Sequence, residues 1–161
     1  MLLGVVSDTH GHAHNTQQAI RILESFAPVA VIHCGDIGSA EIVPMFAPWP
    51  THFVLGNVDE GCPEIERAIM QAGQTYHGAF GNVTLAGKRI AFLHGHDSAR
   101  LRLEMSSGKW DLLCYGHTHQ RDQRRDEQGT LVLNPGALYR ARPHSLAIVD
   151  LSTLDVTSVT L

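Results

Sequence analysis

Five apolar runs in this 161-residue sequence each end in a short polar cluster whose side chains could bind a metal ion. The clusters supply Asp8 and His10, then Asp36, then Asn57 and Asp59, then His94 and His96, and finally His117 and His119. Carboxylate, amide and imidazole groups without thiolates suit Mn, Fe, Co, Ni or Zn. The chain also has 11 histidines in an otherwise ordinary composition, which indicates metal or proton chemistry. The residue types therefore predict a metal site.

Each cluster also has an ordinary structural explanation when it is considered alone. Gly35-Asp36 and Gly56-Asn57 are common turn dipeptides, and Asp8-Thr9-His10 is typical of a capped turn. For His117 and His119, which follow a buried run two positions apart, both explanations stay open. Five such clusters at strand ends are improbable by accident, and ligands of open α/β sheets bind beyond the carboxyl ends of the strands. We therefore expect the clusters to meet at one rim of a sheet.

The elements that must position these side chains alternate between strands and helices in the first half of the chain. Strands are expected over 2–7, 29–34 and 51–55, and helices near 13–26, 39–46 and 63–72. The second half predicts a hairpin of 82–85 and 88–93, a helix near 98–107 and strands over 111–115, 120–126, 130–133, 145–151 and 156–161. Early βαβ units followed by a β meander predict a mixed α/β domain with two sheets.

Length and composition predict a single domain over residues 1–161. The formal net charge is −4, and the interrupted Arg121–Arg125 cluster is typical of a solvated strand, so nucleic acid is not an expected partner. We find no signal peptide and no apolar run near the roughly 20 residues of a membrane span. Three widely spaced cysteines without a CxxC pair fit a reducing compartment, so a cytoplasmic location without membrane association is expected.

In order and spacing, the five clusters resemble the motifs of the calcineurin-like metallophosphoesterases. Asn134-Pro135-Gly136, with Arg142-Pro143 after it, is similar to the small, cap-less phosphodiesterase branch of that family. This branch includes the metallophosphoesterase-like retromer subunit of eukaryotes. The resemblance spans Val5 to Arg142 and implies a four-layer αββα sandwich of two mixed β-sheets flanked by helices, with a dinuclear metal centre.

The resemblance also implies how the side chains divide between two metal ions. One ion would be held by Asp8, His10, Asp36 and His119, and the other by Asp36, Asn57, His94 and His117, with Asp36 as the bridge. Two divalent ions about 3.5–4 Å apart make a bridging hydroxide available as the nucleophile near neutral pH. Manganese is the first expectation, and Ni, Co, Fe or Zn also suit these ligands. Such a centre carries a formal charge of about +1, which favours a phosphate ligand.

The chain departs from the wider family directly after the Asn of the third motif. Val58 stands where larger members have a His that is often assigned as general acid or phosphate ligand. His96 is then our candidate proton donor, with a supporting position behind the ligands as the alternative. Together with Asn57 and Asp59 it forms the expected catalytic set, in which Asp59 orients a ligating histidine.

Other residues near the motifs are expected to have structural or solvent-exposed positions. His12 and His14 could contact substrate, but they are more typical of a solvated loop, and His33 is typical of a hydrogen-bonded core histidine. Ala137 stands where a Ser often follows Asn-Pro-Gly, which we expect to be a mild change in a loop near the metals.

These features predict a dinuclear-metal-dependent phosphodiesterase or phosphatase whose substrate is a phosphate ester. The open site of a cap-less domain favours phosphodiesters. The alternative is a non-catalytic scaffold of the same fold, or a binder of a protein partner or phosphorylated ligand. The complete set of seven ligand-type residues favours the enzyme. A homo-oligomer formed through a C-terminal edge strand is compatible with the sequence.

Overall fold

Strands from both ends of the chain form the first of two β-sheets. The computed structural model describes residues 1–161. The sheet has the order β11 (Asp155–Thr160), β10 (Ser145–Asp150), β1 (Leu2–Val6), β2 (Ala30–His33), β3 (Thr51–Phe53) and β4 (Thr75–Tyr76). Strands β1 to β4 are parallel to one another, and β10 pairs antiparallel with β1 and β11. The parallel pairing brings the carboxyl ends of β1, β2 and β3 to one rim.

The second sheet is built from the central and later parts of the chain. Its order is β5 (Phe80–Leu85), β6 (Lys88–Leu93), β7 (Leu112–Cys114), β9 (Leu131–Asn134) and β8 (Asp122–Arg125). The three inner strands are parallel, and both edge strands are antiparallel to their neighbours. Both sheets are therefore mixed, as the sequence predicts.

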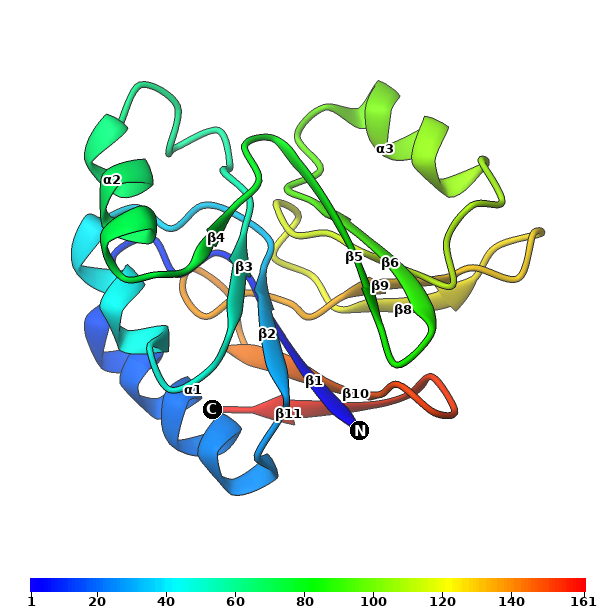
Figure 1. Ribbon diagram of the computed structural model, residues 1–161, viewed down its shortest axis with the longest axis horizontal. Coiled ribbons are helices and arrows are strands. Elements are labelled where there is room, and N and C mark those ends of the chain that lie inside the picture. Colours follow the sequence, from blue (N-terminus) through cyan, green and yellow to red (C-terminus); the bar gives the residue numbers. More distant parts are fainter.

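Helices cover the outer faces of the two sheets, which confirms the predicted four-layer sandwich (Figure 1). The first sheet carries α1 (Ala13–Phe26), the 3-10 helix η1 (Ala40–Phe46) and α2 (Pro63–Gln71). The second sheet carries only α3 (Ser98–Met105), which contributes no buried residue and leaves Leu103 66% exposed. The main apolar clusters thus lie between the sheets and under the first three helices.

Local sequence signals explain most of the element boundaries. Ala86 and Gly87 both adopt positive φ between β5 and β6, as a two-residue hairpin turn requires. Pro63 begins α2 at a favoured first position, and Gly73 follows its end at φ +67°. The predicted helix over 39–46 is a 3-10 helix, since Pro44 removes a backbone donor from its interior. The two-residue strand β4 was missed, because its neighbours supply the pairing rather than any pattern of its own.

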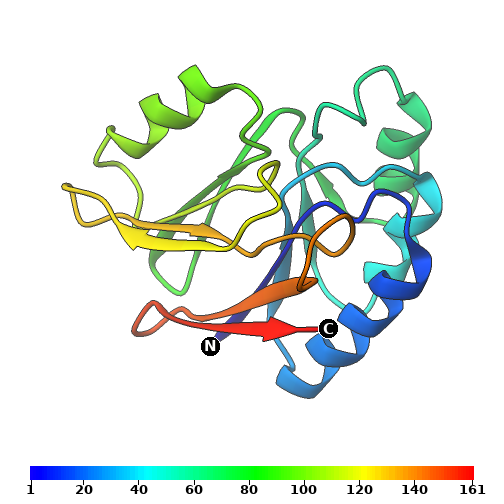
Figure 2. The same ribbon diagram turned by 180° about the vertical axis from the view of Figure 1, so that it is seen from behind.

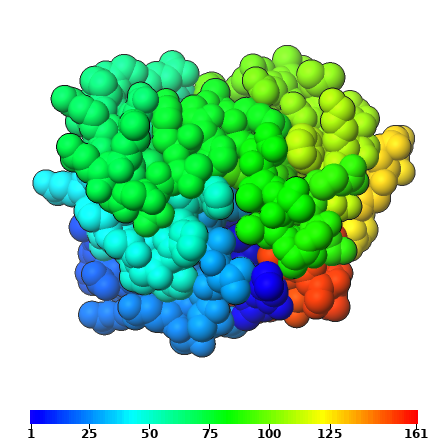
Figure 3. All heavy atoms as spheres, in the orientation of Figure 1, coloured from blue at the N-terminus to red at the C-terminus, as the bar shows by residue number.

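The sandwich has two functionally different ends. In the space-filling view, the N-terminal segment emerges between the β5–β6 hairpin and the turn that joins β10 to β11 (Figure 3). The strand register places these three features at the amino end of β1 and β6. The polar clusters all follow the carboxyl ends of strands, so they gather at the opposite end. No helix of the structure is both long enough and apolar enough to cross a membrane.

Candidate metal centre

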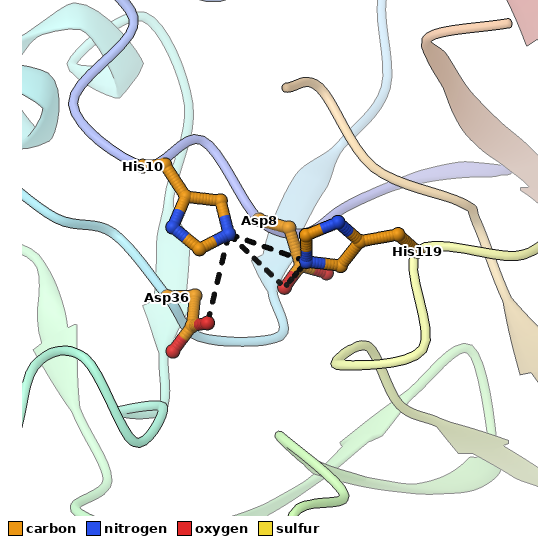
Figure 4. A group of neighbouring side chains, drawn as sticks. All are labelled: Asp8, His10, Asp36 and His119. Carbon is orange, nitrogen blue, oxygen red and sulfur yellow. Dashed lines mark hydrogen bonds and ion pairs between the residues drawn. The ribbon is translucent and has the colours of Figure 1, made fainter. Parts of the chain in front are cut away.

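Four of the predicted ligands converge at the rim of the first sheet (Figure 4). One ligand atom each from Asp8, His10, Asp36 and His119 lies within 4.8 Å of all the others. His119 Nε2 is 3.2 Å from Asp8 Oδ1 and 3.2 Å from His10 Nε2. His10 Nε2 is 3.7 Å from Asp36 Oδ2. Two carboxylates and two imidazoles therefore point at one common space.

Asp36 faces a second group of side chains with its other carboxylate oxygen. Asp36 Oδ1 is 3.2 Å from His94 Nε2 and accepts a hydrogen bond from the Val58 N–H at 3.1 Å. The ring of His117 lies 5.1 Å from the ring of His94, centroid to centroid. Asn57 lies between Gly56 and Val58 on the same loop and is exposed. The two oxygens of Asp36 thus face the two ligand groups that the family resemblance implies.

Backbone carbonyls fix the proton position on two of these imidazoles. His94 Nδ1 lies 2.8 Å from the carbonyl oxygen of Cys34, and His119 Nδ1 lies 3.2 Å from that of Arg140. Because a carbonyl oxygen only accepts hydrogen bonds, Nδ1 must carry the proton in both neutral rings. Each Nε2 then presents a lone pair to the centre, which is the arrangement of a metal-ligating histidine.

The centre contains buried polar atoms that the protein itself does not satisfy. Asp8 Oδ1 and His94 Nε2 are buried and have no hydrogen-bond partner. A buried polar atom without a partner costs roughly 1–3 kcal/mol. Lone pairs also face each other across 3.2 Å between His10 Nε2 and His119 Nε2 unless a proton or cation lies between them. A divalent cation would satisfy these atoms, so the residues present fit a metal ion.

The pKa values in the centre reflect burial and the charges of the neighbouring side chains. Burial raises the pKa of Asp8, although Ser7 and the nearby imidazoles oppose this rise. Burial lowers the pKa values of His10 and His117, which favours neutral rings with available lone pairs. Burial also acts to lower the pKa of His94, but the carboxylates of Asp36 and Asp8 outweigh it and raise that pKa.

The backbone that carries the ligands is unusual. Asp8, His10, Asp36, His117 and His119 all have φ between +45° and +67°, in the left-handed region that non-glycine residues rarely adopt. Each such residue costs of order 1 kcal/mol and persists only where its surroundings enforce it. For Asp8, His10 and Asp36, hydrogen bonds between the loops after β1 and β2 enforce this conformation, in the pairs Asp8 N–Gly35 O, His10 N–Asp36 O and Gly11 N–Ile37 O.

Asp59 has a different position from the one predicted. It was expected to orient a ligating histidine, but its carboxylate accepts three backbone hydrogen bonds, from the N–H groups of Ile37, Gly38 and Gly56 at 2.8–3.0 Å. The side chain is fully buried. Asp59 therefore joins the loop after β2, which carries Asp36, to the loop after β3, which carries Asn57. Sequence spacing shows the carboxylate but not the backbone amides around it.

His96 lies at the open side of the second ligand group. Its ring is 5.5 Å from that of His94 and 6.2 Å from that of His117, centroid to centroid. His96 Nε2 is 3.4 Å from Glu60 Oε1, and the His96 side chain is 31% exposed. Val58 is also exposed on the neighbouring loop. Glu60, which the sequence analysis missed, follows Asp59 directly and had no signal beyond that position.

Two further expectations about histidines had different outcomes. His33 is a hydrogen-bonded core residue, as predicted: it accepts from the Gly35 N–H and bonds to Thr9 Oγ1 at 3.0 Å. Burial lowers the pKa of His33 to about 3, so the ring is neutral. His12 is not a freely solvated loop residue, because Nδ1 accepts from the Asn15 N–H at the start of α1 and the ring stacks on Tyr139.

The loop between β9 and β10 borders the centre. Asn134 Nδ2 donates to the carbonyl of Gly116 and to Thr118 Oγ1, which supports the loop that carries His117 and His119. Further along, the Leu138 and Tyr139 N–H groups donate to the carbonyls of Ser7 and Asp8. The segment that begins with Asn-Pro-Gly therefore does shape a loop beside the predicted ligands.

Comparisons with known proteins agree with this geometry. The sequence profile of the calcineurin-like phosphoesterase superfamily domain matches residues 1–154. A phosphodiesterase of Methanocaldococcus jannaschii is 32% identical over 139 residues, covering 84% of this chain and 83% of that protein. A solved structure described as a novel archaeal phosphodiesterase superposes with a TM-score of 0.91 at 28% identity, over 100% of both chains. Vps29 of Entamoeba histolytica, solved in complex with Zn²⁺, shares the fold with a TM-score of 0.63 at 17% identity, over 100% of this chain and 98% of its own.

Proposed function

The chain belongs to the calcineurin-like phosphoesterase superfamily, and from that membership we propose that it hydrolyses phosphodiesters with the help of two divalent metal ions. One observation carries the proposal. Asp8, His10, Asp36 and His119 converge within 4.8 Å, and a buried carboxylate oxygen of Asp8 in that space has no protein partner. The similarity to phosphodiesterases along most of the chain supports a phosphodiester as the bond that is hydrolysed.

Asp8, His10, Asp36 and His119 would hold one ion, and Asp36, Asn57, His94 and His117 would hold the other. The opposite orientation of the two Asp36 oxygens supports its place as the shared ligand. Manganese is our first choice of metal, and Ni, Co, Fe or Zn suit the same ligands. When bound, such ions supply an activated water near neutral pH and offset the charge of the phosphoryl oxygens.

The protein's own residues orient these ligands and handle the leaving group. The Cys34 and Arg140 carbonyls hold the His94 and His119 rings with Nε2 facing inward. We assign leaving-group protonation to His96, since Val58 offers no proton in the neighbouring position. The Glu60 carboxylate orients the His96 ring through Nε2 and leaves Nδ1 to donate to the departing oxygen.

The first experiment is hydrolysis of bis-p-nitrophenyl phosphate by chelated protein, with Mn, Ni, Co, Zn or Mg added back. The corresponding monoester serves as the comparison substrate. We expect metal-restored cleavage with the diester preferred, and a loss of at least about a hundredfold in Asp36→Asn and His119→Ala. Arg21→Gln, an exposed change on α1, is the matched control. Full activity in either ligand variant would contradict the assigned centre.

A scaffold without catalytic activity is the alternative function of this fold. Absence of cleavage with every metal, on protein shown to be folded and metal-loaded, would overturn the hydrolase proposal. A stoichiometric protein partner found under those conditions would then support the scaffold. Binding of inorganic phosphate without turnover would instead support a receptor for phosphorylated ligands.

A further inference from the structure

A shallow groove lies beside the metal centre, on the loop between β9 and β10. Its volume is about 440 Å³, and it is lined by Tyr139, Arg140, Ala141, Arg142 and His144. None of the four clustered ligands lines the groove. The loop is nevertheless joined to them, since the Tyr139 N–H donates to the Asp8 carbonyl at 3.1 Å and His119 Nδ1 donates to the Arg140 carbonyl at 3.2 Å. Figure 2 shows this orange loop next to the blue turn that follows β1.

Two arginines give the groove a positive charge that the protein does not neutralise. Arg140 and Arg142 are both exposed, and neither guanidinium forms an ion pair with a carboxylate. The formal net charge of the whole chain is −4, so the positive charge of the groove is opposite in sign to that of the protein as a whole. Guanidinium groups form paired, charge-assisted hydrogen bonds with phosphate or carboxylate oxygens.

The groove is also held in a fixed shape. Arg140 has φ +56°, a left-handed conformation that costs a non-glycine residue about 1–2 kcal/mol. The hydrogen bond from His119 to its carbonyl maintains this conformation, so the backbone of Arg140 is set by a ligand of the centre. The Tyr139 ring stacks on His12 at 4.2 Å between centroids and 11° between planes. A rigid aromatic wall and two free cations therefore adjoin the place where the scissile phosphate would bind.

We propose that this groove binds the part of the substrate beyond the scissile phosphate and selects esters that carry a second anionic group there. Arg140 and Arg142 are the specificity residues of this subsite, and Tyr139 forms its wall. The inference rests on the proposed hydrolase function. The residues of the proposed centre would bind the scissile phosphate through their metal ions, whereas the groove, which no clustered ligand lines, is available to another anion.

The test compares thymidine 5′-(p-nitrophenyl phosphate) with the same compound phosphorylated at the 3′ oxygen. Both release p-nitrophenol from the same bond and differ only in a remote phosphate. At fixed ionic strength, we expect wild-type protein to prefer the 3′-phosphorylated ester by about tenfold or more in kcat/KM, chiefly through KM. Arg140→Gln and Arg142→Gln should each reduce this ratio, the double variant should bring it near one, and Arg140→Lys should retain part of it. Arg21→Gln removes the same charge elsewhere and should not change the ratio.

Bis-p-nitrophenyl phosphate, which has no second anionic group, separates the two proposals. If that diester is cleaved but the wild-type ratio is one, or the double variant keeps the full preference, the groove inference alone is overturned. If nothing is cleaved, the hydrolase proposal fails and calorimetry decides the groove inference. Metal-loaded wild-type protein should then bind thymidine 3′,5′-bisphosphate more tightly than thymidine 5′-monophosphate, with the difference lost in the double variant. Equal affinities would overturn the subsite.

Discussion

At the residue scale, the same device prepares two ligands of the proposed centre. One backbone carbonyl accepts a hydrogen bond from the Nδ1–H of His94 and another accepts one from the Nδ1–H of His119, which leaves each Nε2 facing the centre. The carbonyls belong to Cys34 and Arg140, which lie on different loops. The protein's own hydrogen bonds thus set the orientation of both rings.

The burial of His33 predicts how the stability of the folded protein depends on pH. Its pKa in the folded protein is about 3, against an ordinary value of 6.5, because the ring is fully buried. Below pH 6.5, His33 binds a proton in the unfolded chain but stays neutral in the folded protein. The folded state therefore loses stability as the pH falls from 6.5 toward 3. One such group contributes about 2 kcal/mol of loss between pH 7 and pH 5. Denaturant unfolding of chelated protein should therefore show a smaller loss in His33→Gln than in wild type.

His14→Gln is the control for that measurement, since His14 is exposed on α1. It should lose as much stability between pH 7 and pH 5 as wild-type protein. An equal pH dependence in wild-type protein and His33→Gln would show that the buried ring titrates normally.

If His96 is the proton donor, the effect of removing it depends on the leaving group. A proton donor matters most for a basic leaving group, so His96→Gln should slow hydrolysis of a phenyl diester at least about tenfold more than that of the p-nitrophenyl diester. Glu60→Gln should act in the same direction with a smaller effect, because Glu60 only orients the ring. Rates for thymidine 5′-phosphate aryl esters with the two leaving groups measure this difference. Equal losses on both esters would assign His96 to substrate or metal positioning instead.

At the scale of elements, hydrogen bonds join the three loops that the first sheet contributes to the proposed centre, those after β1, β2 and β3. Asp59 links the loops after β2 and β3, because its carboxylate accepts three backbone hydrogen bonds from them. In Asp59→Asn, the amide nitrogen would replace an acceptor oxygen and leave at least one buried N–H unpaired. We expect a loss of about 2 kcal/mol, or roughly 4–8 °C in Tm, together with weaker metal binding.

Thermal unfolding with and without added Mn²⁺ measures both effects. Asp155→Asn, on the exposed strand β11, removes the same charge without touching the loops and should leave the Tm within about 1 °C of wild type. An unchanged Tm in Asp59→Asn would mean that the loops after β2 and β3 hold their positions without this carboxylate.

At the scale of the whole molecule, the proposed centre requires both sheets. Asp8, Asp36 and Asn57 follow strands of the first sheet, whereas His94 and His117 follow strands of the second. Neither half of the sandwich holds a complete ligand set. The apolar cluster between the sheets therefore supports the proposed chemistry as well as stability, because it fixes the distance between the two groups of ligands.

The sequence by itself determined the types of the side chains, the strands they follow and the end of the sheets at which they gather. These are local properties: hydrophobic runs specify strands, and turn residues such as Ala86-Gly87 specify their connections. The family resemblance added the four-layer order. The two-residue strand β4 could not be predicted, since only its pairing with β3 defines it. Pro44 is the one sequence signal for the 3-10 form of η1.

Only the tertiary structure decided which group each polar side chain meets. Asp59 contacts backbone amides rather than a histidine, His96 pairs with Glu60, and the Arg140 loop lies against His119. These partners come from loops distant in the chain, and backbone donors and acceptors leave no mark in a sequence pattern. The charge of the groove lined by Arg140 and Arg142 likewise depends on the tertiary structure, because only the folded surface decides whether a carboxylate lies near enough to pair with them.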